Sequence, residues 1–130
     1  RRTLRIVSEI GARFPLHATA NGKALLAALS PDEVYELLPK RLPASTKNTV
    51  TDRETLLREL DEIRKTGVAR DREEFTIGIS AVGTAVRDAV GSVAAITVVV
   101  PVTRFDGSEA QITAALVRTR DEIQAVLNGG

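Results

Sequence analysis

Few residues of this chain could carry catalysis. There is one histidine, His17, and there is no cysteine, so thiol chemistry is excluded and the usual ligands of a metal cluster are lacking. Ser80 does not stand in a G-x-S-x-G elbow, and the spacing of His17, Thr19 and Lys23 matches no catalytic triad. Because a lone histidine is more often a packed residue than a catalytic one, we expect no catalytic residue, no metal and no cofactor.

Anion binding is a second kind of chemistry, and the segment around Thr19 and Asn21 offers it. Both residues are good helix caps and precede the apolar run 24–29, so a buried helix is expected to begin here. The amide groups and the positive dipole end of a helix start favour a carboxylate. Simple capping, with Gly22 allowing close backbone packing, is the alternative, and chemistry alone favours it because nearly every helix start carries such groups.

The charge run 71–74 is the other polar feature. In an extended chain the carboxylates of Asp71 and Glu73 would share one face, which could line a cavity, while Arg72 and Glu74 would share the other. Such runs are usually a solvated edge, and both interpretations remain open. The 18 basic and 17 acidic residues are interleaved along the chain, which argues against a nucleic-acid surface.

Sequence patterns around these residues predict an α+β domain. Alternation predicts strands at 4–10 and 79–86, an extended segment at 68–75, and a tight turn at 88–91. The near-continuous β-branched run 93–100 predicts a central strand that is covered on both faces. Caps predict helices that begin at Thr19, at Ser30 with Glu33 completing its capping box, at Thr51 with Glu54 completing its box, and at Ser108. The third of these helices is expected to end at Gly67 and to carry the apolar stripe Leu56, Leu57, Leu60 and Ile63.

The bulk composition fits one domain. At 130 residues with 43% hydrophobic residues the chain can form one core, and with only three Phe and one Tyr that core must be aliphatic. The longest apolar runs are too short to span a membrane. No methionine occurs anywhere, so we expect the chain to be a piece of a longer protein.

Three segments of the chain resemble, in order, the motifs of one protein family. The first is residues 15–27 (PLHATANGKALLA), and the second is residues 60–75 (LDEIRKTGVARDREEF) followed by Gly78. The third runs from Val86 through Gly91 to Ile96. Together they resemble the C-terminal effector-binding domain of bacterial transcription regulators of the isocitrate-lyase-regulator (IclR) family.

This resemblance implies a GAF-like (profilin-like) α+β fold, with helices packed on a mostly antiparallel sheet. Residues 1–130 would be a single effector-binding domain fragment, without the N-terminal winged helix-turn-helix domain and the first strands of the sensor domain. The resemblance further implies a cytoplasmic homodimer or tetramer that touches DNA only through the missing domain and has no contact with membranes.

The resemblance also implies a binding site for a small organic acid. The backbone at Ala20, Asn21 and Gly22 would receive the ligand carboxylate, and Asp71 matches the pocket acid of the family. Three further positions lie on strands, so the implied ligand-binding set is Ala20, Asn21, Gly22, Asp71, Ala81, Thr97 and Val99.

The identity of the strand positions bears on the ligand. Ala81 stands where some members have a thiol, and Thr97 and Val99 stand where members that sense small keto acids have hydroxyls. Because Ala81 and Val99 remove hydrogen-bond partners, we expect an acid that is larger or more apolar than pyruvate, such as an aromatic acid. Two alternatives remain: a pure oligomerisation module with a vestigial pocket, and an enzyme with His17 pointing into the cavity.

Overall fold

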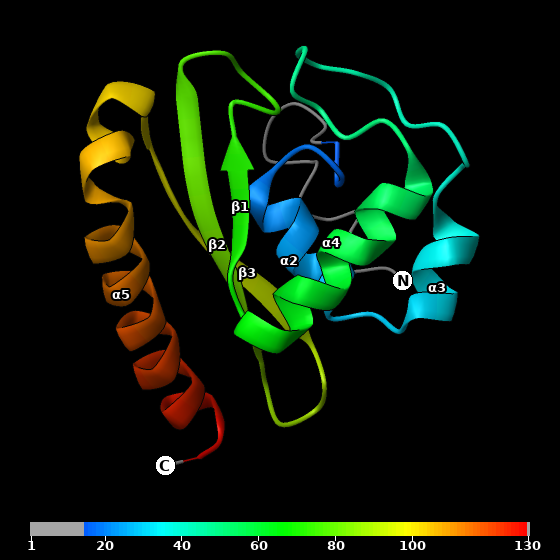
Figure 1. The fold of residues 1–130 in the computed structure, drawn as a ribbon. Helices are drawn as coiled ribbons and strands as arrows, with labels where there is room; N and C mark the ends of the chain where they lie inside the picture. Colours follow the sequence, from blue (N-terminus) through cyan, green and yellow to red (C-terminus); the bar gives the residue numbers. More distant parts are fainter. Residues whose placement is uncertain (1–14, 130) are drawn as a thin grey trace.

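The computed structural model describes residues 15–129, which form an antiparallel sheet with helices on both faces (Figure 1). Helix α5 covers one face, and helices α2 and α4 cover the other. The predicted α+β class is therefore confirmed. In chain order the elements are α2 (Ala20–Ala27), α3 (Pro31–Leu37), α4 (Arg53–Thr66), β1 (Ala69–Arg72), β2 (Ile79–Arg87), β3 (Val93–Pro101) and α5 (Val102–Leu127).

The strand register separates the sheet into two faces. The order is β1-β2-β3, and both pairs are antiparallel. Partners that lie opposite each other point to the same side, and successive residues point to opposite sides. One face therefore carries the row Asp71, Ala81 and Val99, while the other carries rows such as Arg70, Val82 and Val98.

The face under α5 is an aliphatic core with one aromatic ring. Val68, Val82, Phe105 and Leu116 are buried there, and half-buried residues of β3 pack around them. The α5 helix begins at Val102, with Pro101 at its N-cap, so the predicted start at Ser108 is wrong. No helix within residues 15–129 is both long and apolar enough to cross a bilayer.

The other face packs against α2 and α4. The predicted stripe of α4 is confirmed, because Leu56, Leu60 and Ile63 are buried against α2 and β1. The helix ends as expected at Gly67, whose φ of 80° is left-handed and whose amide bonds the Ile63 carbonyl at 2.7 Å. Its N-cap, however, is Asp52 and not Thr51.

The β3 strand does not have the position that its apolar run predicts. Within the described residues it lies at the edge of the sheet, and Val99 is 61% exposed. Its even-numbered residues Ile96, Val98 and Val100 pack under α5, which explains half of the apolar pattern. The prediction of full cover on both faces is wrong for this part of the chain, and the strand predicted at 4–10 lies outside it.

Candidate functional site

The start of α2 is built for close packing. Thr19 is the N-cap, and its hydroxyl accepts a hydrogen bond from the Gly22 amide at 3.1 Å. A Cβ at Gly22 would lie 2.6 Å from Leu16 Cα, so only glycine fits there. The expectation that Gly22 permits close packing is confirmed, and its amide already has a partner within the helix cap.

The first turn of α2 rests directly on the middle of β2. A Cβ on Gly83 would lie 3.1 Å from the carbonyl carbon and oxygen of Ala20, and Ala20 itself is 1% exposed. A glycine inside a strand often marks such an approach of another backbone. Because Thr97 pairs with Gly83 across the sheet, the start of the helix lies over the row that contains Thr97.

The register brings the predicted strand residues together. Asp71 lies opposite Ala81, and Ala81 lies opposite Val99, so the three side chains form one row on the α2 face. Thr97 lies two residues from Val99 on that same face. Five of the seven predicted residues therefore share this surface, while Asn21 is half-buried in the first turn of α2 and the α-carbon of Gly22 faces Leu16.

Asp71 is a buried carboxylic acid, 5% exposed. Burial raises the pKa of Asp71 above its usual 3.8, and the nearby charge of Glu74 acts in the same direction. The Glu74 amide donates to Asp71 Oδ1 at 2.8 Å, and this bond and the Lys23 charge oppose part of the rise. Asp71 thus has a structural partner and also carries a proton more readily than an exposed aspartate.

The chain turns sharply after Arg72, and this turn separates the carboxylate of Asp71 from that of Glu73. Glu73 has a left-handed φ of 59°, so the alternation of an extended strand stops at this residue. Its carboxylate accepts the Gly78 amide at 3.0 Å, and its carbonyl accepts the Thr46 hydroxyl at 2.7 Å. The predicted face shared by the carboxylates of Asp71 and Glu73 is therefore wrong.

The Thr97 hydroxyl lies on the α2 face and is one of four buried side-chain polar atoms without a hydrogen-bond partner in the described part of the chain. Its Oγ1 atom is shielded from solvent and has no hydrogen-bond partner within the described part of the chain. Buried hydroxyls are normally paired, because an unmade hydrogen bond costs about 1–3 kcal/mol. Asp71 and Thr97 therefore lie on the same face of the sheet, on the two strands that flank β2, and the start of α2 packs on β2 between them.

Lys23 is a charged residue that the sequence analysis did not identify as part of a site. It is completely buried in α2, and its Nζ lies 2.5 Å from Glu59 Oε2, 2.5 Å from Glu74 Oε1 and 2.9 Å from the Arg70 carbonyl. Glu59 is 36 residues away along the chain, so no local pattern points to the contact. A lysine within an apolar helix was the one available signal, since lysine is rarely buried unless it is paired.

His17 is a packed residue. Its side chain is almost completely buried, and Nε2 lies 2.7 Å from the Pro43 carbonyl. A hydrogen bond to the backbone orients the ring toward the loop 39–52. The alternative that makes His17 a catalyst therefore gains no support from its surroundings.

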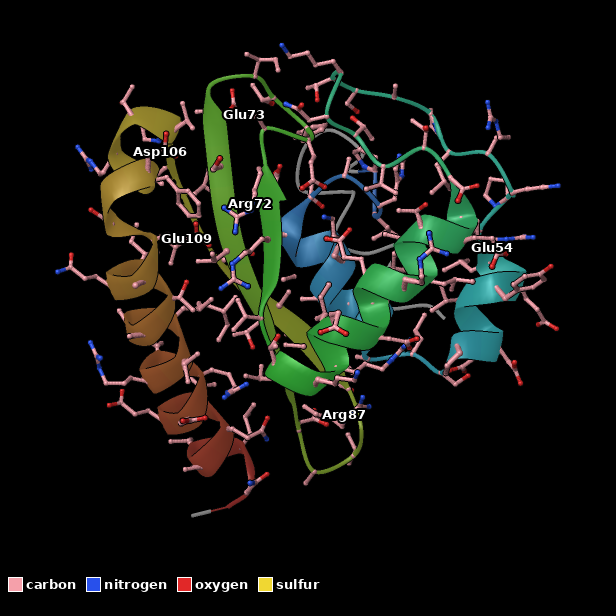
Figure 2. The ribbon with its side chains drawn as sticks, in the orientation of Figure 1. Glu54, Arg72, Glu73, Arg87, Asp106 and Glu109 are labelled. Atoms are coloured by element: carbon pink, nitrogen blue, oxygen red, sulfur yellow. The ribbon has the colours of Figure 1, made fainter. Side chains whose placement is uncertain are left out.

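A shallow groove lies on the other side of the β1 edge. It encloses about 310 Å³ between α4 and β1, and none of the seven predicted residues lines it. Its charged residues are already engaged: Arg70 and Arg72 bind Glu109 of α5 at 2.6 and 2.8 Å, and Glu59 binds Lys23. Figure 2 shows Arg72 and Glu109 side by side between β1 and α5. We therefore locate the candidate site on the α2 face and not in this groove.

The α2 and α4 helices on one face and α5 on the other define a GAF-like α+β domain, and the comparisons identify its family. A sequence model described as "Bacterial transcriptional regulator IclR C-terminal" matches residues 1–125. The chain therefore belongs to the IclR family of bacterial transcriptional regulators and corresponds to the C-terminal domain of that family.

Relatives and solved structures agree with this assignment. The chain is 49% identical to the HTH-type transcriptional regulator Rv1719 of Mycobacterium tuberculosis, over 97% of this chain and 49% of that protein. It is 38% identical to the HTH-type transcriptional repressor AllR of Escherichia coli, over 78% of this chain and 38% of that protein. It thus spans about half or less of the length of these relatives, which are named as regulators and not as enzymes.

A solved structure from Acinetobacter has the same fold. It is a double mutant of the inducer-binding domain of the PobR transcription factor, in complex with 3-hydroxybenzoic acid. The TM-score is 0.79 at 30% sequence identity, and the match covers 88% of this chain and 69% of that one.

Proposed function

We propose that this domain senses a small organic acid, which binds between the start of α2 and the adjoining sheet face. The acid would contact the proposed set of seven residues and would change how a longer regulator binds DNA in the cytoplasm. The relatives named HTH-type are about twice as long as this chain, which supports a separate DNA-reading domain. No covalent chemistry is needed, because binding energy alone can shift the population of two arrangements.

The observation that carries this proposal is the buried hydroxyl of Thr97. It has no partner within residues 15–129 and lies on the face where Ala20 approaches Gly83. A ligand oxygen that bonds this hydroxyl would remove the penalty of leaving it unpaired.

The surface around Thr97 favours an acid with an apolar body. Ala81 and Val99 offer only hydrocarbon, and Gly83 adds no side chain, so the polar contacts are few. A benzoate-like acid would place its ring on these residues and its polar groups at Thr97 and α2. The similarity to an inducer-binding domain in complex with 3-hydroxybenzoic acid supports this class.

A thermal-shift panel tests the proposal. The full chain would be heated with 3-hydroxybenzoate, benzoate, pyruvate and the uncharged 3-hydroxybenzamide. An acid present at about 100 times its Kd stabilises the folded state by about 2.7 kcal/mol, so the Tm of the protein must rise. We expect the aromatic acids to raise the Tm more than pyruvate does; no shift with any acid up to millimolar concentration would contradict acid sensing.

Asp71 must be tested with a conservative substitution, because its carboxylate also accepts the Glu74 amide in the turn after β1. Asp71→Asn keeps an oxygen that accepts the Glu74 amide, whereas Asp71→Ala would break that bond. We expect Asp71→Asn to keep the fold and to weaken the best acid of the panel. Equal affinity in the variant and the parent would remove Asp71 from the site.

Oligomerisation is the competing function, and the same protein can decide it. We expect a homodimer or tetramer by sedimentation analysis, with a Tm that also responds to acids. A stable oligomer that responds to no acid would instead identify the domain as an assembly module with a vestigial pocket.

A further inference from the structure

We infer that Lys23 is a positioning residue of the proposed acid site, which it serves through Glu74 and without touching the ligand. The inference rests on the proposed function for its ligand and on the geometry of the buried lysine for everything else. We infer that one ammonium group fixes α2 to the turn after β1, whose Glu74 amide bonds Asp71, and that it keeps the site able to accept an anion.

The surroundings of Lys23 leave it no freedom to bind a ligand itself. The ammonium group donates hydrogen bonds to Glu59 and to the Arg70 carbonyl at 2.5 and 2.9 Å, and it forms an ion pair with Glu74 Oε1 at 2.5 Å. The side chain is fully buried. Its effect on a ligand must therefore pass through the groups that it holds.

These groups connect three elements to the site. Glu59 belongs to α4, Arg70 belongs to β1, and Glu74 belongs to the turn after β1. Glu74 connects Lys23 to Asp71. Its carboxylate forms an ion pair with Lys23 and accepts the backbone amide of Arg72, and its own backbone amide donates to Asp71. A displacement of Glu74 would therefore move the hydrogen bond that orients Asp71.

The balance of charge gives Lys23 a second effect. Two carboxylates, Glu59 and Glu74, contact the single ammonium group, and Asp71 lies close enough to respond to both Glu74 and Lys23. A bound acid would add one more negative charge at the adjacent start of α2. Without Lys23 that acid would face several carboxylates and no buried cation, and in a poorly solvated site such repulsion is strong.

Amide hydrogen exchange in the full chain tests the positioning role without any ligand. The variant is Lys23→Met, and the matched control is Lys65→Met, which removes an exposed lysine that pairs with Glu62. The reporters are the amides of Gly22 and Glu74, which donate to Thr19 and Asp71. The amide of Leu116, on the opposite face, reports global unfolding.

We expect Gly22 and Glu74 to exchange about tenfold faster in Lys23→Met, beyond the change at Leu116, and to be unchanged in Lys65→Met. If all three amides accelerate equally, Lys23 is an ordinary core residue and the inference is overturned. If Lys23→Met does not fold, Lys23→Met/Glu74→Gln replaces it, because that pair leaves one fewer buried charge unpaired. The double variant is judged by the same criteria as Lys23→Met: faster exchange at Gly22 and Glu74 than at Leu116 supports the inference, and equal acceleration of all three amides overturns it.

The charge effect has its own readout. For the acid that gives the largest thermal shift, the folded variant is expected to lose about tenfold in affinity, while the matching carboxamide changes by less than about twofold. Equal losses for the acid and its amide would overturn the charge effect. If no acid binds the parent chain, the proposed function fails, and the exchange data alone still decide whether Lys23 positions the site.

Discussion

The two faces of the sheet differ in how they are filled. Under α5, Val82, Phe105 and Leu116 form a closed apolar layer. On the α2 face the middle of the sheet carries Gly83 and Ala81. Beside them lie the acid Asp71 and Thr97, whose hydroxyl has no partner within residues 15–129. Large apolar side chains thus fill the α5 face, although the buried Thr113 hydroxyl of α5 also has no partner within residues 15–129. The middle of the α2 face instead carries small residues, and the proposed acid site lies there.

Under the proposed function, stability and binding are divided between the two faces of the sheet. Apolar burial on the α5 face contributes folding free energy at every position. A buried acid and a hydroxyl without a described partner lower the stability of the fold. Such groups are typical of sites where contacts with a ligand compensate for this loss. Substitutions on the α5 face should therefore change stability alone, and those on the α2 face should change binding.

The largest expected effect is on the α5 face. Phe105→Ala removes a ring that is only 1% exposed and should lower the free energy of unfolding by about 3–5 kcal/mol. Urea denaturation measures this loss, and acid affinity of the folded fraction should be unchanged. A loss below about 1 kcal/mol would mean that this layer does not carry the stability.

A smaller effect is expected where α2 meets the sheet. Gly83→Ala places a methyl group 3.1 Å from the Ala20 backbone, so the helix must shift, at about 1–3 kcal/mol, and acid affinity should fall. Gly107→Ala is the matched control, because a methyl group there meets nothing within 4 Å in α5. It should stabilise the helix by up to about 1 kcal/mol; equal behaviour of the two variants in calorimetry would contradict close approach at Gly83.

Two isosteric substitutions, one on each face, should change the stability of the fold in opposite directions. Thr97→Val removes a hydroxyl without a described partner and should raise stability by about 1 kcal/mol while weakening acid binding. Thr84→Val, on the α5 face, removes a hydroxyl that donates to the Gly67 carbonyl at 2.6 Å, so it should lower stability by about 1 kcal/mol. Chemical denaturation of both variants measures the difference, and a loss of stability in Thr97→Val would show that its hydroxyl has a partner.

The smallest effect concerns the charged rim of the α5 face and depends on pH. Hydrogen bonds from Arg72, and then from Arg70, lower the pKa of Glu109 below its usual 4.5. The ion pairs therefore add stability above about pH 4.5, and this contribution disappears as the pH falls through the lowered pKa.

Because these pairs are partly exposed, Glu109→Gln should cost at most about 1 kcal/mol at pH 7 and nothing in strong acid. Urea midpoints at pH 7 and at about pH 3 measure this change. Glu62→Gln on α4 is the control, since its pair with Lys65 is largely exposed. A difference between parent and Glu109→Gln that is independent of pH would rule out the ion pairs as its cause.

Local patterns predicted much of the fold. The stripe and the Gly67 stop of α4 follow from residues within that helix, and the capping box of Ser30 and Glu33 is present in α3 as predicted. The start of α5 was missed because Pro101 at the N-cap makes no side-chain hydrogen bond that a pattern would reveal. Local propensity therefore located the elements better than their ends.

The candidate site was harder to predict because distant contacts create it. The row of Asp71, Ala81 and Val99 depends on the strand register, and strand pairing is not visible in any one segment. The burial of Lys23 depends on Glu59 and Glu74, which are far away along the chain. The resemblance to the family indicated the candidate positions, whereas the burial and pairing of Lys23 became visible only in the fold.

The shared register of the three strands also limits how this domain can evolve. The side-chain period of a strand is two, so deletion of one residue from β2 would exchange the faces of every residue beyond it. Val82 would then point toward α2, and Gly83 would leave a gap beneath α5. Changes in length are therefore expected in the loops at 38–52 and 88–92, while new ligand specificities arise by substitution at fixed strand positions.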